Sequence, residues 1–167
     1  MAQNKQVNVI HNLSSMDVAI LLPLNNAHAK ETSALDNASF AALLDMAFYA
    51  RGIDRGATAF LIALDHNAAY TSPNFVWFKA ARESFVYIDR IIVLSSARGR
   101  GIARLLYDDL FSAARKAGHD RVVCEVNIDP PNLVSEAFHA TMGFERVGEA
   151  TIRNGTKTVR YLEKTLR

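Results

Sequence analysis

The sequence is poor in cysteine, because Cys124 is the only one among its 167 residues. A single thiol excludes an internal disulfide and a zinc site built from thiolates, and it suits a reducing compartment. Long apolar runs are also missing. Residues 1–12 are polar and mixed, unlike a signal peptide, and no run approaches the roughly 20 residues of a membrane helix. We therefore expect a soluble cytoplasmic protein with no membrane partner.

A charge excess of either sign is absent as well. Lys plus Arg number 19 and Asp plus Glu number 17, which gives a formal net charge of +2. So small a positive charge does not indicate a nucleic-acid-binding protein, and we expect no nucleic-acid partner. Half of the residues are hydrophobic, an ordinary globular composition, and the length fits one domain over residues 1–167.

The second half of the chain has the clearest periodicity. Residues 85–94 are nearly continuous in apolar side chains, as in a central strand covered on both faces. An apolar stripe at helical spacing predicts a helix over residues 101–117, ended by Gly118. The stripe consists of Ile102, Leu105, Leu106, Leu110, Ala113 and Ala117. Further along we predict a strand (121–128), a helix (132–142) and a hairpin (144–150 and 156–164) turning at Asn154-Gly155.

The first half predicts a similar alternation. Ser14 and Asp17 form a capping-box pattern before a helix over residues 15–26, which Pro23 should kink or end. The remaining elements expected here are a short strand (7–10), a helix (37–45) and a strand–turn–strand unit (48–51, 52–56 and 57–64).

Residues 67–82 form an aromatic segment that we expect to be irregular. Ser72-Pro73-Asn74 lies in its middle, and four aromatic side chains surround this tripeptide, namely Tyr70, Phe75, Trp77 and Phe78. A long aromatic loop is a candidate substrate lid. Equally, it can be a hydrophobic cluster that packs onto the domain. The sequence leaves both interpretations open.

The clearest candidate for a binding site is the glycine-rich turn of residues 93–103, between the predicted central strand and the longest predicted helix. The N–H groups at a helix N-terminus and the close approach that glycine permits make an anion site. A P-loop needs Gly-Lys-Ser/Thr, which is missing, and a dinucleotide fingerprint needs a small residue where Arg104 stands. The pattern that remains is Arg/Gln-x-x-Gly-x-Gly/Ala, matched by Arg98, Gly101 and Ala103.

That pattern resembles the first signature of the GNAT superfamily of N-acetyltransferases. A second GNAT signature, Asn-x-x-Ala/Ser-x-x-x-Tyr-x-x-x-Gly-Phe, resembles the run from Asn132 through Ser135 and His139 to Gly143-Phe144. The resemblance is good from Phe85 onward and is greatest to a bacterial branch with an Asp-Pro-Pro-Asn sequence (129–132), which implies no particular substrate. It implies an α/β (α+β) GNAT fold, with a central mixed twisted sheet of about six to seven strands and helices on both faces.

The resemblance further implies that acetyl-CoA is the cosubstrate. Its pyrophosphate would lie on the backbone amides of Arg98, Gly99, Arg100, Gly101, Ile102 and Ala103, and Arg104 adds a charge. Its pantetheine arm would pair with Ile91 and Val93, and the Val93 amide would donate to the thioester oxygen. Asn132 and the segment from Ser135 to His139 would flank the other side of the arm.

Catalytic roles are less sharply implied. His139 stands where the family commonly has the Tyr that protonates the leaving thiolate, and a histidine suits that work. Glu125 and Asp89 are candidate bases, because each is an acid within an apolar strand. Asp89 adjoins Arg90 and can instead form a structural ion pair, so Glu125 is favoured. Cys124 and Glu125 should face opposite sides of one strand, with Cys124 in the core.

The acceptor site is the least defined part. Asn25, Asn26, Glu31, Tyr70 and Trp77 are expected near it, only from the positions of the first helices and the aromatic segment in such a fold. His11, His28, His66 and His119 show no metal-ligand spacing, and we expect no metal.

Three functions remain open at this point. The first is an N-acetyltransferase that acts on a primary amine by direct transfer. The second is a non-catalytic acyl-CoA sensor, and the third is a transferase of a longer acyl group. A homodimer is common among such proteins.

Overall fold

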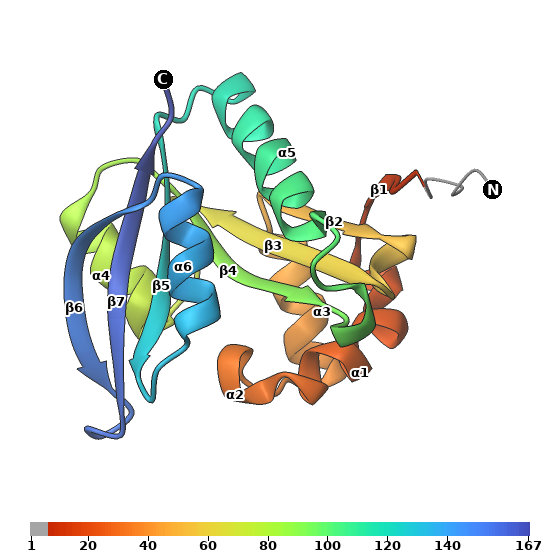
Figure 1. Cartoon of the computed structure of the whole chain (residues 1–167), viewed down its shortest axis with the longest axis horizontal. Helices are drawn as coiled ribbons and strands as arrows, with labels where there is room; N and C mark the ends of the chain where they lie inside the picture. Colours follow the sequence, from red (N-terminus) through yellow and green to blue (C-terminus); the bar gives the residue numbers. More distant parts are fainter. Residues whose placement is uncertain (1–6) are drawn as a thin grey trace.

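A seven-stranded mixed sheet forms the centre of the protein in this computed structural model, which describes residues 7–167 (Figure 1). The strand order is β1-β2-β3-β4-β5-β7-β6, and the pair β4–β5 is parallel. The strands are β1 (Ile10–Asn12), β2 (Tyr49–Ile53), β3 (Ala59–Asp65), β4 (Val86–Val93), β5 (Arg121–Asp129), β6 (Glu145–Ile152) and β7 (Lys157–Thr165). The expected sheet of a GNAT-type α/β fold is confirmed.

Helices cover both faces of this sheet. They are α1 (Val18–Ala27), α2 (Ala29–Thr32), α3 (Asn37–Met46), α4 (Pro73–Ala81), α5 (Ile102–Lys116) and α6 (Leu133–Thr141). Side chains of α5 and the end of α6 build one hydrophobic cluster with the sheet, and α1, α3 and α4 build another on the opposite face. Among residues 7–167, no helix has the length and apolar character needed to cross a membrane.

The two central strands of the sheet separate along their length. β4 pairs with β5 only at Val86–Val122 and Tyr87–Val123, and beyond these pairs the strands have no ladder between them. β3 pairs Ile62 with Arg90 and Ala63 with Ile88, so Asp89 is an extra residue in a bulge. This opening in the middle of the sheet positions the candidate site.

Several predicted elements differ in detail. The first strand comprises residues 10–12 rather than 7–10 and pairs with β2. Pro23 does not end α1, which continues to Ala27, because Leu21 and Leu24 on its buried face hold the helix against the core. The capping box of Ser14 and Asp17 is confirmed, whereas the short helix α2 was not predicted.

The aromatic segment is not irregular, so that prediction is wrong. Pro73 occupies the first turn of α4, where its missing N–H costs nothing. Phe75 and Phe78 are fully buried, and the Trp77 ring stacks on Tyr161 with 4.2 Å between ring centroids. Of the two interpretations, the packed hydrophobic cluster is the one observed, and the lid is not.

Truncating a buried ring of α4 tests this assignment. Phe78→Ala should lower the free energy of unfolding by about 3–5 kcal/mol, because it leaves a cavity in the core. Val76→Ala is the matched control on the same helix, since Val76 is 50% exposed and should change stability by less than about 1 kcal/mol. Urea unfolding of both variants measures the difference, and equal small effects would indicate a loosely attached segment.

Candidate functional site

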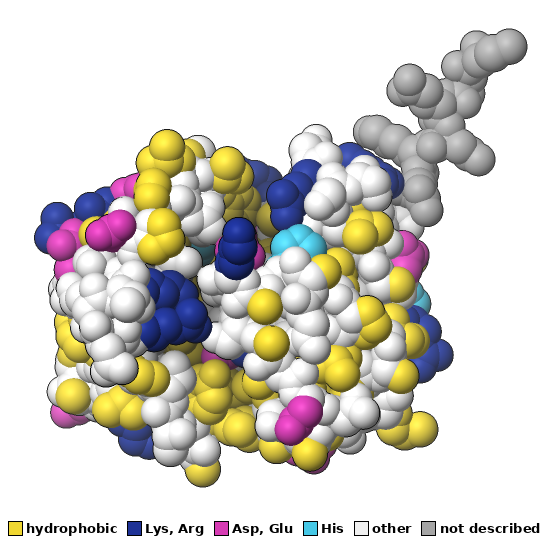
Figure 2. Space-filling view, turned by 90° about the horizontal axis from the view of Figure 1, so that it is seen from below, with side chains coloured by type: hydrophobic (Ala, Val, Ile, Leu, Met, Phe, Trp, Pro, Cys, Tyr) yellow, Lys and Arg dark blue, Asp and Glu magenta, His cyan; other side chains and the backbone are white. Residues whose placement is uncertain are grey.

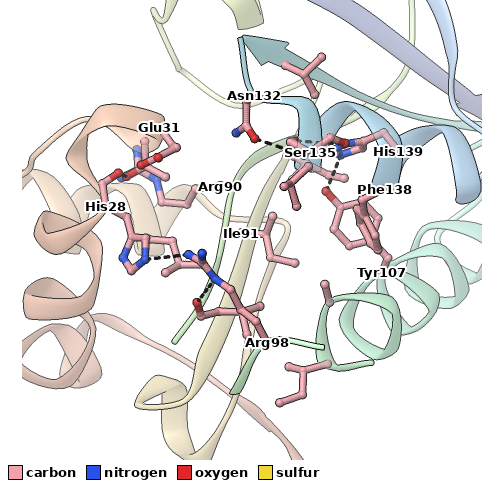
Figure 3. A pocket seen from close by; sticks show the side chains of 18 of the residues that line it. His28, Glu31, Arg90, Ile91, Arg98, Tyr107, Asn132, Ser135, Phe138 and His139 are labelled. Carbon is pink, nitrogen blue, oxygen red and sulfur yellow. Dashed lines mark hydrogen bonds between the residues drawn. The ribbon is translucent and has the colours of Figure 1, made fainter. Parts of the chain in front are cut away.

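A cavity of about 650 Å³ lies where β4 and β5 separate. Its walls come from α2, β4, the β4–α5 turn, the first turns of α5, β5 and α6, as Figure 3 shows for the labelled side chains. Viewed from below, the surface is hollowed between its two halves, and Lys and Arg side chains border the hollow (Figure 2). A cavity of this size fits a small molecule or the reactive arm of a larger one.

The glycine turn supplies backbone donors at one end of the cavity. Gly99 and Gly101 have φ values of 75° and 76°, and a Cβ at either position would meet nothing within 4 Å. Gly101 is the N-cap of α5 and provides no side-chain cap. The first helical bond runs from the Leu105 amide to the Gly101 carbonyl. The preceding amides of Ile102 and Ala103 therefore lack helical partners and are available to an anion.

The three arginines of the turn differ in position. All three are exposed, and Arg98 and Arg104 line the cavity whereas Arg100 does not. Arg98 Nε donates to the Val93 carbonyl at 3.3 Å, and its Nη2 lies 3.2 Å from His28 Nε2. Arg98 thus connects the turn to β4 and to the end of α1, so part of its donor capacity serves the protein itself.

Two backbone amides of β4 face the opening. The Leu94 amide donates to the Thr58 carbonyl beside β3 at 2.8 Å. Since successive residues of a strand alternate in direction, the amides of Ile91 and Val93 point the other way, toward the separated β5. The Val93 carbonyl, which shares that direction, accepts from Arg98 rather than from a strand. The cavity wall therefore offers an edge that an extended ligand can pair with.

Glu125 lies on β5, two residues beyond the last β4–β5 pair, and it lines the cavity. The Tyr87 hydroxyl donates to its carboxylate at 2.8 and 3.0 Å, and the Asn74 side-chain amide donates as well. Burial raises the pKa of Glu125 to about 7, against the opposing effect of these donors. A carboxylate with this pKa can take a proton near neutral pH.

Asp89 also lines the cavity, but both of its oxygens are engaged. Oδ1 accepts from the Tyr70 hydroxyl at 2.5 Å, and Oδ2 accepts from Arg90 Nε at 2.7 Å. Arg90 Nη1 in turn donates to Asn25 Oδ1 at 2.6 Å. Asp89 is thus the anion of a buried ion pair, which is the structural interpretation that the neighbouring Arg90 suggested.

His139 is buried, with only 4% of its surface exposed. Its Nδ1 lies 2.7 Å from the Ser135 carbonyl oxygen, which only accepts, so Nδ1 carries the proton. Its Nε2 then accepts from the Tyr107 hydroxyl at 2.8 Å. Burial lowers the pKa of the ring. The neutral ring therefore has no proton to donate into the cavity, contrary to what its place in the second signature suggested.

Tyr107 is one of the lining residues that sequence reasoning missed. It lies on α5 and is fully buried beside Leu106 and Leu110. A signal existed, because Tyr107 stands four residues before Phe111 and three before Leu110, on the apolar side of the helix. Asn132 and Ser135, which were expected here, do line the cavity, and the Asn132 side chain caps α6 by accepting from the Ser135 amide.

The expected acceptor residues are mostly elsewhere. Glu31 lines the cavity, whereas four other candidates do not: Asn25, Asn26, Tyr70 and Trp77. The first two link α1 to the segment after α2 by hydrogen bonds, and the aromatic pair packs with the core. The expectation that these four side chains line the acceptor site is therefore wrong. They contact other parts of the protein behind the cavity wall.

Cys124 is buried in the cluster under α5, on the face opposite to Glu125, as alternation predicted. Burial raises the pKa of its thiol, so it is not a reactive nucleophile.

His28 lines the cavity beside Arg98. In the described part of the chain, no three His, Cys, Asp or Glu side chains are grouped to hold a metal ion.

Solved structures share this fold. The ribosomal-protein-S18-alanine N-acetyltransferase from Escherichia coli superposes with a TM-score of 0.69 at 14% identity, covering 96% of this chain and 94% of that one. The ribosomal-protein-alanine N-acetyltransferase from Brucella melitensis has 0.69 at 20%, covering 95% and 99%. YncA from Salmonella typhimurium, solved with its cofactor acetyl-CoA, has a TM-score of 0.69 at 17% identity, covering 95% of this chain and 94% of that one.

The sequence itself matches a family model described as the acetyltransferase (GNAT) family, over residues 26–144. The matched region contains the helices from α2 to α6, the strands from β2 to β5 and the whole glycine turn. Together with the strand order, the separation of β4 from β5 and the uncapped start of α5, this match identifies the chain as a member of the acetyltransferase (GNAT) family.

Proposed function

We propose that this protein is an N-acetyltransferase that transfers the acetyl group of acetyl-CoA to a primary amine. One observation carries the proposal. A single cavity connects unpaired amides at the start of α5 with the Glu125 carboxylate on β5, so an anion site and a candidate base share one opening. The acetyl-CoA bound to the similar YncA structure supports the choice of cosubstrate.

The glycine turn would hold the pyrophosphate of acetyl-CoA. The residues fit, because the missing side chains of Gly99 and Gly101 leave the backbone open and the helix end favours negative charge. Arg104 adds a cation at this end. Ile91 and Val93 would pair with the pantetheine arm, and Asn132 and Ser135 would flank it across the opening. The Val93 amide is our proposed donor to the thioester oxygen, where negative charge develops during attack.

The proposed reaction is direct transfer in a ternary complex. Glu125 accepts a proton from the ammonium form of the acceptor, and the neutral amine attacks the thioester carbonyl carbon. A C–N bond forms and the C–S bond breaks, so CoA leaves as the thiolate. The thiolate takes the proton that the attacking nitrogen still carries. Glu125 returns its proton to solvent, and the products are an amide and the CoA thiol.

This scheme does not use His139 as the acid. The ring offers no proton in its neutral form, and burial disfavours the imidazolium form. We propose instead that His139 and Tyr107 fix one wall of the pantetheine channel. The same feature favours a second function, a non-catalytic acyl-CoA sensor. Release of CoA thiol with a panel of amines separates the two, since only the enzyme releases it.

Acetyl-CoA binding is the first property to measure. Gly101→Trp places a large side chain in the cradle and should weaken binding at least tenfold in calorimetry. Gly118→Trp is the matched control at the other end of α5, because Gly118 also has a positive φ and open space around it. Both variants bear a similar backbone strain of about 1–2 kcal/mol. Unchanged binding in Gly101→Trp would show that the phosphates lie elsewhere.

The pH dependence of kcat/KM tests the base. Below about pH 7 the rate should fall tenfold per unit, because the carboxylate of Glu125 becomes protonated. Tyr87→Phe removes a donor that stabilises the charged form, so the pKa of Glu125 should increase and the acidic limb should move to higher pH. Tyr49→Phe, whose hydroxyl donates to the remote Asp109, should leave the limb in place. Glu125→Gln should lower the rate by about 10²–10⁴-fold.

Stability gives an independent check on Glu125. Its pKa is higher in the folded chain than the ordinary value of 4.5, so ionisation destabilises the fold as the pH rises toward 7. The free energy of unfolding of Glu125→Gln, relative to the wild type, should therefore increase between pH 4.5 and 7 by a total on the order of 1–3 kcal/mol. Above pH 8 the difference between the two proteins should stay constant. Urea unfolding across this range measures it, and a pH-independent difference would contradict the raised pKa.

A further inference from the structure

Charged groups of both signs lie in and beside the part of the cavity that contains Glu125, and this arrangement restricts the acceptor. The inference rests on the proposed function. The acidic groups are Glu125 inside the cavity and the exposed Glu31 on α2. The basic groups are Lys157, the first residue of β7, and Arg153, in the turn between β6 and β7; they lie beside the cavity and are not among its lining residues.

Strand register places Lys157 on the Glu125 side of the sheet. Glu125 pairs with Tyr161 and Asn127 pairs with Val159, so these residues share one face. Lys157 lies two residues before Val159 and four before Tyr161, and alternation directs it to the same face. It interacts electrostatically with both Glu125 and Glu31.

Lys157 is partly buried, yet it forms no hydrogen bond or close ion pair with any side chain in residues 7–167. Burial and the neighbouring Arg153 lower its pKa, while Glu125 and Glu31 oppose that effect. A partly buried cation that interacts with two carboxylates at a distance, and is hydrogen-bonded to neither, has its donors available to a ligand. An anionic group there would receive charge-assisted hydrogen bonds.

The opening is also limited in width. The Arg153 side chain donates to the Ser33 hydroxyl at 2.7 Å, which links the β6–β7 turn to the segment after α2. Ser33 directly follows α2, whose Glu31 lines the cavity, so this link lies beside the opening; both segments are at the bottom of Figure 1. An acceptor therefore enters beside this link as a small molecule more easily than as the side chain of a folded protein that lies across it.

A zwitterion matches these features better than a simple amine. A polyamine would place its further cations beside Lys157 and Arg153, where like charges repel. A molecule with one ammonium and one nearby carboxylate satisfies both signs at once. We propose that the acceptor is an α-amino acid, with its ammonium directed to Glu125 and its carboxylate held by Lys157, which makes Lys157 a specificity-determining residue.

The test compares matched acceptors by CoA-thiol release. Twenty free amino acids, their methyl esters and the corresponding decarboxylated amines are assayed, with short peptides that have an acidic second residue as a further arm. For the best amino acid, kcat/KM should exceed that of its ester and its amine by about tenfold or more. Lys157→Met should reduce this ratio toward one, and Lys157→Arg should preserve most of it. Lys116→Met, an equal charge change at an exposed position on α5, should leave the ratio unchanged.

Each result bears on the proposal. Esters or decarboxylated amines that react as well as the amino acids would overturn it, as would a ratio that Lys157→Met does not change. Activity with acidic peptides alone would overturn it in favour of a protein N-terminus. Inactivity with all amino acids would overturn it too. The proposed acetyltransferase function is contradicted only when the folded wild-type protein also fails to bind acetyl-CoA or to acetylate any amine.

Discussion

The separation of β4 from β5 is the constraint on which the rest of the site depends. Two parallel strands that pair at only two positions leave backbone groups without ladder partners in the middle of a sheet. Buried N–H and C=O groups need partners, so such an opening persists where a ligand, a side chain or solvent supplies them. Here Arg98 satisfies the Val93 carbonyl, and the neighbouring amides remain for a bound molecule.

The two carboxylates at this opening show how partners decide the role of a buried acid. Asp89 has the Arg90 guanidinium beside it, so its charge is neutralised within the protein. Within residues 7–167, the hydrogen-bond donors to Glu125 are the neutral side chains of Tyr87 and Asn74. These donors and the electrostatic effect of Lys157 do not balance the cost of burying its charge, so its pKa rises. Two acids at equivalent distances beyond the last strand pair thus have different chemistry: one stabilises the wall, and the other is the proposed base.

Local patterns predicted the parts of the site that depend on neighbours in sequence. The glycine turn, the central strand and the extent of α5 were all evident, because glycine spacing and apolar periodicity are local. The buried face of α5 was predicted incompletely: Leu105 is 37% exposed, while Tyr107 and Phe111 are buried. Which flank of α5 is covered depends on α6, whose Phe138 and His139 rings contact Tyr107. This contact is not visible in sequence spacing, whereas the ion pair of Asp89 with its neighbour Arg90 was.

Hydrogen-bond directions also bear on whether an acyl-enzyme is needed. The Ser135 hydroxyl lies 3.3 Å from His139 Nδ1, a separation typical of an activated nucleophile. That nitrogen carries its proton toward the Ser135 carbonyl, so it does not accept the hydroxyl proton, and Ser135 is not activated. Cys124 faces the other side of its strand with a raised pKa. Because neither side chain is placed to attack a thioester, the arrangement supports the proposed direct transfer, in which the amine itself is the nucleophile.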